Sequence, residues 1–203
     1  MFITFEGLDF CGKSTQVKLL KEKLEAIGKK VILIREPGGT QISEKVREIL
    51  LDKKNSEMHI EAELLLFSAS RAQLVREKIL PLLKDGHFVI SDRFHDSSIA
   101  YQGFGRGINL DSVKEIQKFA IGSAVPVLTF FIDLPLNEID KRRIEYGVTN
   151  LDRIELSEDA FYNRVRKGYI ELSKEESRFI TVDGTDTIQN IHNEIVKRVL
   201  ERI

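Results

Sequence analysis

The sequence predicts an α/β fold, in which helices cover both faces of a five-stranded parallel sheet and form three layers with it. Short apolar, β-branched runs alternate with segments whose apolar residues recur every three or four positions, the pattern of strands joined by right-handed helical crossovers. The first apolar run leads into a glycine-rich loop, residues 7–14, and then into a helical pattern. A length of 203 residues without a linker indicates one domain, residues 1–203.

In the first half of the chain, three apolar runs predict buried strands at residues 1–6, 31–34 and 87–91. Apolar residues on one face predict helices at about residues 17–27, 42–50 and 60–83. Gly28 ends the first of these helices. Pro37, Gly38 and Gly39 exclude a regular element from residues 35–40, which we expect to form a loop.

In the second half, a polar helix is expected at residues 95–101, followed by a loop at residues 103–107 that contains three glycines. Apolar runs predict the last two strands, at residues 126–132 and 179–182. Helical periodicity predicts the remaining helices, from residue 109 or 111 to residue 122, and at about residues 136–146, 161–172 and 188–199.

The composition excludes several classes of function. A net charge of −1 provides no global field that would recruit nucleic acid. No run reaches the ~18 apolar residues of a membrane span. The only cysteine, Cys11, allows no intramolecular disulfide, so we expect a soluble protein in a reducing, cytoplasmic compartment. Because no base is paired with Cys11, we interpret it as a small loop residue. The four histidines are scattered, so no Cys/His metal site is expected.

The glycine-rich loop fits G-x-x-x-x-G-K-[S/T], and it lies between a predicted strand and a predicted helix. The alternative, an ordinary glycine turn, is disfavoured by this context. Backbone N–H groups and the helix N-terminus would hold the phosphates of a nucleoside triphosphate. Lys13 would contact the outer phosphates, and Ser14 would bind Mg²⁺. The predicted ATP-binding residues are Gly7, Leu8, Asp9, Phe10, Cys11, Gly12, Lys13, Ser14 and Thr15.

Acidic residues follow two of the other strands, at the edge of the sheet where ligands bind in open α/β folds. Asp92 and Asp133 both suit a residue that orients hydrated Mg²⁺. We favour Asp92, because the adjacent Arg93 suits a phosphate. Asp133 has the alternative of a residue at a helix entry.

Arg142, Arg143 and Arg153 flank a glycine-containing segment, residues 142–154, which we interpret as a mobile lid. Closure of such a lid would bring guanidinium groups to the charge that develops during phosphoryl transfer. The alternative is a solvated helix face.

Two further clusters suit an acceptor pocket. Phe67 and Arg71 are four residues apart on one helix face, so an aromatic ring and a guanidinium could both meet a base. Ser97, Ser98 and Tyr101 share one helix turn and would form a wall of the pocket. The alternatives are a core aromatic beside a surface charge, and a polar helix face.

Taken together, these motifs resemble the thymidylate kinase family. The resemblance covers residues 5–155 in four blocks. They are F-E-G through S-T at residues 5–15, R-E-P-G-G-T at 35–40, D-R-F…S-S…A-Y-Q-G at 92–103, and L-D-R-I-E at 151–155. The third block is the most specific to the family, and the second points to its bacterial branch. A nucleoside-monophosphate-kinase-like fold is implied.

The resemblance also implies roles for the matched positions. Asp9 would contact the sugar 3′-hydroxyl and the metal region, and Asp92 would serve the Mg²⁺ shell. Arg93 would hold the acceptor phosphate. The thymine would stack on Phe67 and receive a hydrogen bond from Arg71, with Ser98 and Gln102 lining its pocket. Tyr101 would crowd the sugar 2′ position and select deoxyribose.

Phe10 departs from some relatives, which carry an arginine at that position of the loop. The catalytic charge would then come from the lid arginines, Arg142, Arg143 and Arg153, as in the bacterial type with a basic lid. The expected reaction is ATP + dTMP → ADP + dTDP with Mg²⁺, by a protein that family resemblance makes a homodimer. The alternatives are a kinase for another nucleotide or deoxynucleoside, and a P-loop regulatory ATPase.

Overall fold

The computed structural model describes residues 1–147 and 151–203, and within them five parallel strands form one sheet in the order β2-β3-β1-β4-β5. The strands are β1 (Phe2–Glu6), β2 (Val31–Arg35), β3 (Phe88–Asp92), β4 (Leu128–Asp133) and β5 (Phe179–Asp183). Each begins and ends within two residues of the run that predicted it. The predicted three-layer α/β fold is therefore confirmed.

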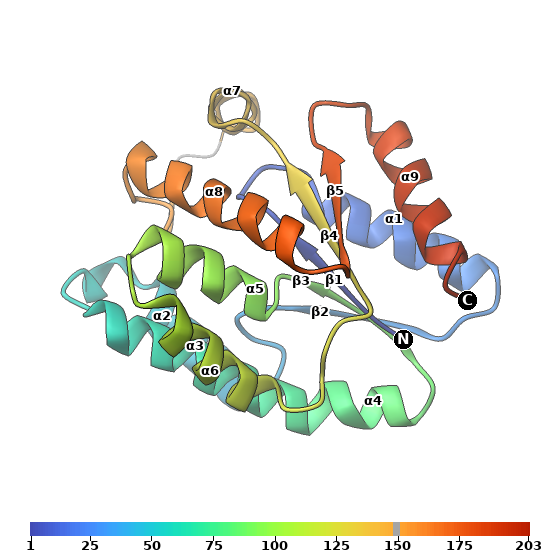
Figure 1. Ribbon diagram of the computed structural model, residues 1–203, viewed down its shortest axis with the longest axis horizontal. Coiled ribbons are helices and arrows are strands. Elements are labelled where there is room, and N and C mark those ends of the chain that lie inside the picture. Colours follow the sequence, from blue (N-terminus) through green and yellow to red (C-terminus); the bar gives the residue numbers. More distant parts are fainter. Residues whose placement is uncertain (148–150) are drawn as a thin grey trace.

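Helices cover both faces of this sheet (Figure 1). The helices are α1 (Lys13–Ala26), α2 (Gln41–Leu51), α3 (Ile60–Leu74), α4 (Leu80–Lys84), α5 (His95–Ser98), α6 (Leu110–Ile121), α7 (Leu136–Glu145), α8 (Asp159–Glu175) and α9 (Ile188–Leu200). The described part of the chain also contains a 3₁₀ turn (Lys53–Asn55) and two π-helical segments (Val75–Ile79 and Ile99–Gly105). On one face, α1 packs against α9, and on the other α3 packs against α6. No helix in the described ranges is long and apolar enough to cross a membrane.

Burial of the strands follows their place in the sheet. Every residue of the central strand β1 is buried, whereas the edge strands β2 and β5 each contain exposed positions. The central strands are covered by helices on both faces, so both of their faces must be apolar. This burial fixes the position of the loop that leaves β1 at residue 7.

The long helix expected at residues 60–83 is confirmed as helical from Ile60 to Lys84, with one irregular segment that the sequence did not predict. Its middle, Val75–Ile79, is π-helical, and Pro81 then lies in the first turn of α4. Proline has no N–H and clashes with a regular preceding turn, so a widened turn before it keeps the two helical parts in line.

The expected polar helix and glycine loop at residues 95–107 are also corrected. Residues 95–98 are all buried, and the next segment, Ile99–Gly105, is π-helical. A Cβ at Gly105 would lie 2.6 Å from a ring carbon of Phe161, and one at Gly103 would lie 2.7 Å from Leu110. These glycines therefore allow close packing against α8 and α6 and do not mark a surface loop.

Part of the predicted lid, residues 148–150, lies outside the described residues. The lid and the single-domain assignment stay predictions.

Candidate active site

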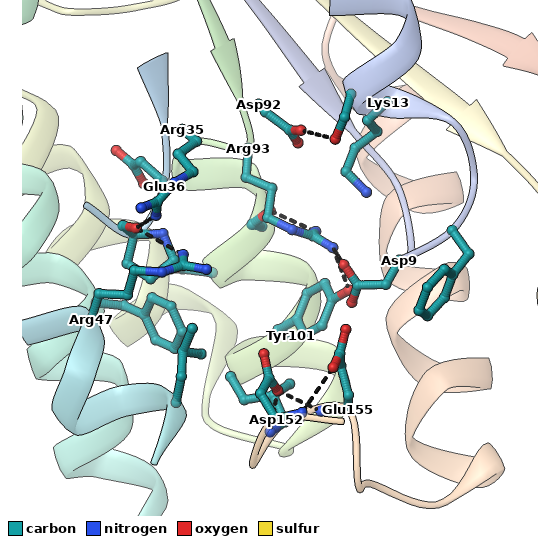
Figure 2. Close-up of a pocket in the computed structure, with 18 of the residues that line it drawn as sticks. Asp9, Lys13, Arg35, Glu36, Arg47, Asp92, Arg93, Tyr101, Asp152 and Glu155 are labelled. Atoms are coloured by element: carbon teal, nitrogen blue, oxygen red, sulfur yellow. Dashed lines mark hydrogen bonds and ion pairs between the residues drawn. The ribbon is translucent and has the colours of Figure 1, made fainter. Parts of the chain in front are cut away.

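A cavity of about 510 Å³ opens at the carboxyl ends of β1, β2 and β3 (Figure 2). The strand register pairs Asp92 with both Phe5 and Arg35, so the three strands end at one edge. Fourteen of the predicted residues line it: Asp9, Phe10, Gly12, Lys13, Ser14, Thr15, Phe67, Arg71, Asp92, Arg93, Ser97, Ser98, Tyr101 and Gln102. Gly7, Leu8 and Cys11 complete the loop behind it, and Arg142, Arg143 and Arg153 lie outside its lining.

The glycine-rich loop forms one wall of this cavity. Gly7 has a φ of 137°, and a Cβ there would lie 2.6 Å from the carbonyl oxygen of Ile132, so only glycine fits. Gly12 precedes α1 in the left-handed conformation, and no side chain caps the helix. The first N–H groups of α1 are therefore open to an anion.

Lys13 is folded back onto the loop. Its Nζ donates to the carbonyl oxygens of Gly7, at 3.1 Å, and Leu8, at 2.7 Å, and lies 3.7 Å from the Cys11 sulfur. These are contacts that a phosphate oxygen can replace, because the ammonium has three freely rotating donors. The Lys13 ammonium is thus held by the loop, next to the place where a bound phosphate would lie.

Ser14 and Asp92 fit a hydrated Mg²⁺. The Ser14 hydroxyl donates to Asp92 Oδ2 at 2.7 Å and so joins the start of α1 to the end of β3. The proton lies on the side of Asp92, so the lone pairs of Ser14 Oγ are left for a metal. Hard oxygen ligands of this kind are what Mg²⁺ prefers. Asp133, the alternative, is held at 2.6 and 2.9 Å by the Arg166 guanidinium.

Arg93 lies at the centre of the cavity. Its Nη2 donates to Asp9 at 2.7 Å and to the Tyr101 hydroxyl at 3.1 Å, while Nη1 donates to the Gly7 carbonyl at 2.9 Å. Its backbone has a φ of 69°, which few residues other than glycine adopt. Burial alone would raise the pKa of Asp9, but the charges of Arg93 and Lys13 outweigh it and lower that pKa. The Asp9 carboxylate is therefore ionised at neutral pH.

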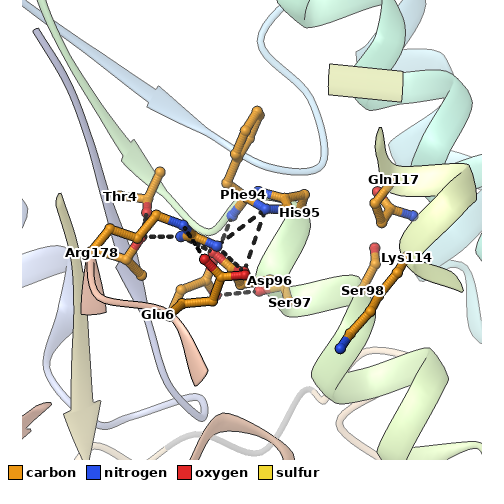
Figure 3. Close-up of polar contacts among 12 residues, drawn as sticks. Thr4, Glu6, Phe94, His95, Asp96, Ser97, Ser98, Lys114, Gln117 and Arg178 are labelled. Atoms are coloured by element: carbon orange, nitrogen blue, oxygen red, sulfur yellow. Dashed lines mark hydrogen bonds and ion pairs between the residues drawn. The ribbon is translucent and has the colours of Figure 1, made fainter. Parts of the chain in front are cut away.

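A buried network holds the turn that contains Arg93 (Figure 3). Glu6, the last residue of β1, accepts from the Phe94 N–H at 2.8 Å, from the Ser97 hydroxyl at 2.6 Å and from the Tyr169 hydroxyl at 2.9 Å. Burial, with the nearby charge of Asp96, raises the pKa of Glu6 to about 7. The same network explains why Ser97 is buried. Its hydroxyl group points mainly toward the Glu6 carboxylate and less toward the cavity.

Two further arginines line the cavity near Arg93. Arg35 and Arg47 both donate to the carbonyl oxygen of Pro37, at 2.9 and 3.0 Å, and Arg35 also pairs with Glu44. Three guanidinium groups on one wall form a site for an anion distinct from the glycine-rich loop. The sequence offered no signal for Arg47, because a lone arginine on an amphipathic helix is usually a surface charge.

Phe67 and Arg71 share a face of α3, as predicted, and both reach the cavity. Phe67 is half-buried, whereas Arg71 is fully buried. The Arg71 guanidinium donates to Glu36, Ser98, Gln117 and the Phe94 carbonyl. The guanidinium thus donates four hydrogen bonds within the protein, and Nη2 also lies 2.6 Å from the Glu36 carboxylate. A base that receives a hydrogen bond from Arg71 would compete with these partners.

The three lid arginines lie in different places. Arg142 spans the loop, 3.3 Å from the Cys11 carbonyl and 2.7 Å from that of Gly184. Arg143 pairs with Asp140 on the surface of α7. Arg153 is turned away from the loop, with Nη2 2.7 Å from Glu63 and Nε donating to the Leu50 carbonyl. In this conformation a buried carboxylate holds Arg153, and the catalytic role of the three arginines stays a prediction.

Asp152 and Glu155 line the cavity opposite Asp9 and were not predicted as site residues (Figure 2). Asp152 accepts from the N–H groups of Ile154 and Glu155, at 2.8 and 2.9 Å, and Glu155 accepts from the Asp152 N–H at 2.8 Å. Burial raises the pKa of Glu155. Their place in the L-D-R-I-E block was the available signal.

A phosphate loop that faces a second, arginine-lined anion site across one cavity defines a P-loop nucleotide kinase. The thymidylate kinase family profile matches residues 5–195. The chain is 50% identical to thymidylate kinase of Thermosipho africanus over 202 residues, covering 100% of this chain and 98% of the relative. It is 47% identical to that of Kosmotoga olearia, covering 98% and 95%.

A solved structure agrees with these sequence relatives. Crystalline thymidylate kinase from Ehrlichia chaffeensis superposes with a TM-score of 0.79 at 36% identity, covering 98% of both chains. The chain belongs to the thymidylate kinase family.

Proposed function

We propose that this chain transfers the γ-phosphoryl group of ATP to the phosphate of dTMP, giving ADP and dTDP. The observation that carries the proposal is the two-sided cavity, with the phosphate loop on one wall and Arg35, Arg47 and Arg93 on the other. Two anionic groups fit there at once, as a donor and a phosphorylated acceptor require. Thymidylate as the acceptor comes from the family.

The donor would bind on the loop. Its phosphates would accept from the N–H groups of residues 7–15, and Lys13 would exchange its loop carbonyls for phosphate oxygens. Arg142, already 3.3 Å from the Cys11 carbonyl, is the lid arginine best placed to follow the γ-phosphoryl group. Mg²⁺, held near Ser14 and Asp92, would neutralise phosphate charge.

The acceptor would bind on the opposite wall. Arg93 would hold its phosphate, with support from Arg35 and Arg47, and Asp9 would orient the sugar 3′-hydroxyl. The base would stack on Phe67 between Ser98 and Gln102. The Tyr101 ring, packed under the Arg93 guanidinium at 5.0 Å, would exclude a 2′-hydroxyl.

No covalent intermediate is needed, because the reaction requires positioning and charge neutralisation. Closure of the segment at residues 142–154 would exclude water and limit wasteful hydrolysis of ATP. We also propose that the protein acts in the cytoplasm, as one domain per chain.

The test is ADP formation from ATP and Mg²⁺ with dTMP, dUMP, dCMP and thymidine as separate acceptors. We expect dTMP to give the highest kcat/KM. Thymidine as the best acceptor would indicate a nucleoside kinase. ATP turnover that no acceptor accelerates would indicate a regulatory ATPase.

We further propose a homodimer formed by the apolar faces of α3 and α6. Leu65 on α3 and Phe119 on α6 are 56% and 80% exposed, and the two helices pack against each other. Light scattering should give twice the mass of one chain, and Leu65→Glu with Phe119→Glu should reduce it to that of one chain. A wild-type protein of monomer mass would overturn this proposal.

A further inference from the structure

Glu63, in α3, is a buried carboxylate behind the cavity that no step above uses. It is 1% exposed. Gln102 Nε2 donates to its Oε1 at 3.0 Å, and Arg106 donates to both oxygens at 3.2 Å. Arg153 Nη2 lies 2.7 Å from Oε2. Burial raises the pKa of Glu63, but these donors and the two guanidinium charges outweigh it, so the pKa is lowered. Glu63 is therefore ionised at neutral pH.

The charge of Glu63 determines which way the Gln102 amide faces. An ionised carboxylate accepts hydrogen bonds and donates none. The NH₂ of Gln102 must therefore point to Glu63, and its carbonyl oxygen must point elsewhere. The reversed amide would bring two acceptors together without a proton between them. Gln102 is nearly fully buried and lines the cavity beside Phe67 and Ser98, so this amide has one defined hydrogen-bonding face toward a ligand.

We propose that Glu63 is a positioning residue for base selection: it holds Gln102 with its carbonyl oxygen toward the cavity, which favours a pyrimidine carrying N3–H over cytosine. Thymine and uracil present a donor at N3, and cytosine presents a lone pair there. The inference rests on the proposed function, because it takes a pyrimidine nucleotide as the acceptor.

The same carboxylate connects this pocket to the segment at residues 152–155. Arg153 is fixed by Glu63 and by the Leu50 carbonyl, and it lies between Asp152 and Ile154, which line the cavity. Loss of Glu63 thus has two effects, on the Gln102 amide and on the placement of that segment. Only the first changes the choice between bases, so discrimination is the readout that separates them.

The experiment measures the ratio of the dissociation constants of dCMP and dTMP, with dCMP measured by competition. Glu63→Gln replaces the carboxylate by an amide that either donates or accepts, so Gln102 can turn. We expect the ratio to fall at least tenfold. In a Gln102→Ala background the same substitution should change the ratio less than twofold. The matched control is Arg106→Gln, which removes contacts to Glu63 but keeps its charge, and it should leave the ratio within twofold of the wild type.

An unchanged ratio in folded Glu63→Gln protein would overturn the inference, as would an equal fall with and without Gln102. If Glu63→Gln does not fold, the charge-balanced pair Glu63→Gln with Arg106→Gln is compared with Arg106→Gln alone, and the same tenfold fall is expected. Wild-type protein that turns over ATP but does not bind dTMP would contradict the proposed function itself. That result needs no variant, so it is distinguished from a failure of the inference about Glu63.

Discussion

The Arg93 guanidinium donates to the Asp9 carboxylate across 2.7 Å and so joins the end of β3 to the phosphate loop. The glycine-rich loop and the arginine-lined wall of the cavity meet at this contact. Because Asp9 is ionised and Arg93 stays charged, Arg93 can bind a phosphate and Asp9 can accept a hydrogen bond from a sugar hydroxyl. Arg93 also donates to the loop through the Gly7 carbonyl, so its position depends on the fold of both walls.

Arg93→Lys should therefore damage acceptor binding far more than donor binding. A lysine keeps the charge but cannot reach Asp9, Gly7 and a phosphate together, because it lacks the planar fork of donors. We expect kcat/KM for dTMP to fall about 10²- to 10³-fold, the scale of a lost charge-assisted contact in a phosphoryl-transfer site. The affinity for ATP, measured by fluorescence titration without acceptor, should change less than about threefold. Equal losses for both nucleotides would contradict the assignment to the acceptor phosphate.

Arg71→Ala should cost both stability and acceptor affinity. The substitution leaves the Glu36 carboxylate buried without its cation, since Arg71 contacts it through Nε and Nη2. Breaking a buried pair on one side costs about 3–5 kcal/mol of unfolding free energy, which urea denaturation would measure. KM for dTMP should rise far more than KM for ATP.

A second variant separates these two effects. Adding Glu36→Gln to Arg71→Ala removes the unpaired charge, so part of the lost stability should return. The affinity for dTMP should stay low, because the guanidinium is still missing. Recovery of dTMP affinity together with stability would show that Arg71 supports the fold without contacting the base.

Much of the fold, with the glycine-rich loop after its first strand, could be predicted from the local sequence for physical reasons. The strands were readable because β1 is buried on both faces and is therefore rich in apolar residues, with Phe2, Ile3 and Phe5. The loop was readable because Gly7 and Gly12 fill conformations that other residues avoid.

The parts that were missed depend on contacts between residues far apart in the chain. No local pattern shows that Arg153 pairs with Glu63, ninety residues away, or that the polar residues 95–98 are buried. The glycines of the π-helical segment at Ile99–Gly105 allow it to pack closely against α6 and α8. In the sequence alone, the same glycines are typical of a loop.

Arg142 and Arg153 should differ in what they contribute to the reaction. Arg142→Met removes the guanidinium that spans the phosphate loop, so kcat should fall about 10²-fold or more, on the scale of arginines that stabilise phosphoryl transfer. Arg153→Met removes a contact to Glu63 on the far side, so we expect a smaller loss in kcat and a fall in melting temperature. Steady-state kinetics with both substrates saturating would measure the difference. A larger loss of kcat in Arg153→Met would indicate that the segment rearranges fully on closure.

The ionisation of Glu6 should make the stability of the protein depend on pH. Its pKa is about 7 in the folded protein and near 4.5 when unfolded, and the charged and titratable groups that face it are Asp96, Arg93 and Tyr169. A folded pKa above the unfolded one means that the unfolded chain loses this proton first. The contribution of Glu6 to stability is therefore fully present below pH 4.5 and is lost as pH rises to about 7.

Glu6→Gln isolates that contribution, because glutamine mimics the protonated carboxyl and can still accept from the Phe94 N–H. A difference of about 2.5 pKa units corresponds to about 3 kcal/mol. We expect the unfolding free energy of Glu6→Gln, relative to the wild type, to increase by about that amount between pH 4.5 and pH 7.5, and to stay constant above. Urea denaturation across this range measures it, and background titrations cancel in the difference. A difference that does not vary with pH would show that the pKa of Glu6 is the same in the folded and the unfolded chain, so that the Ser97 and Tyr169 hydroxyls compensate its burial in full.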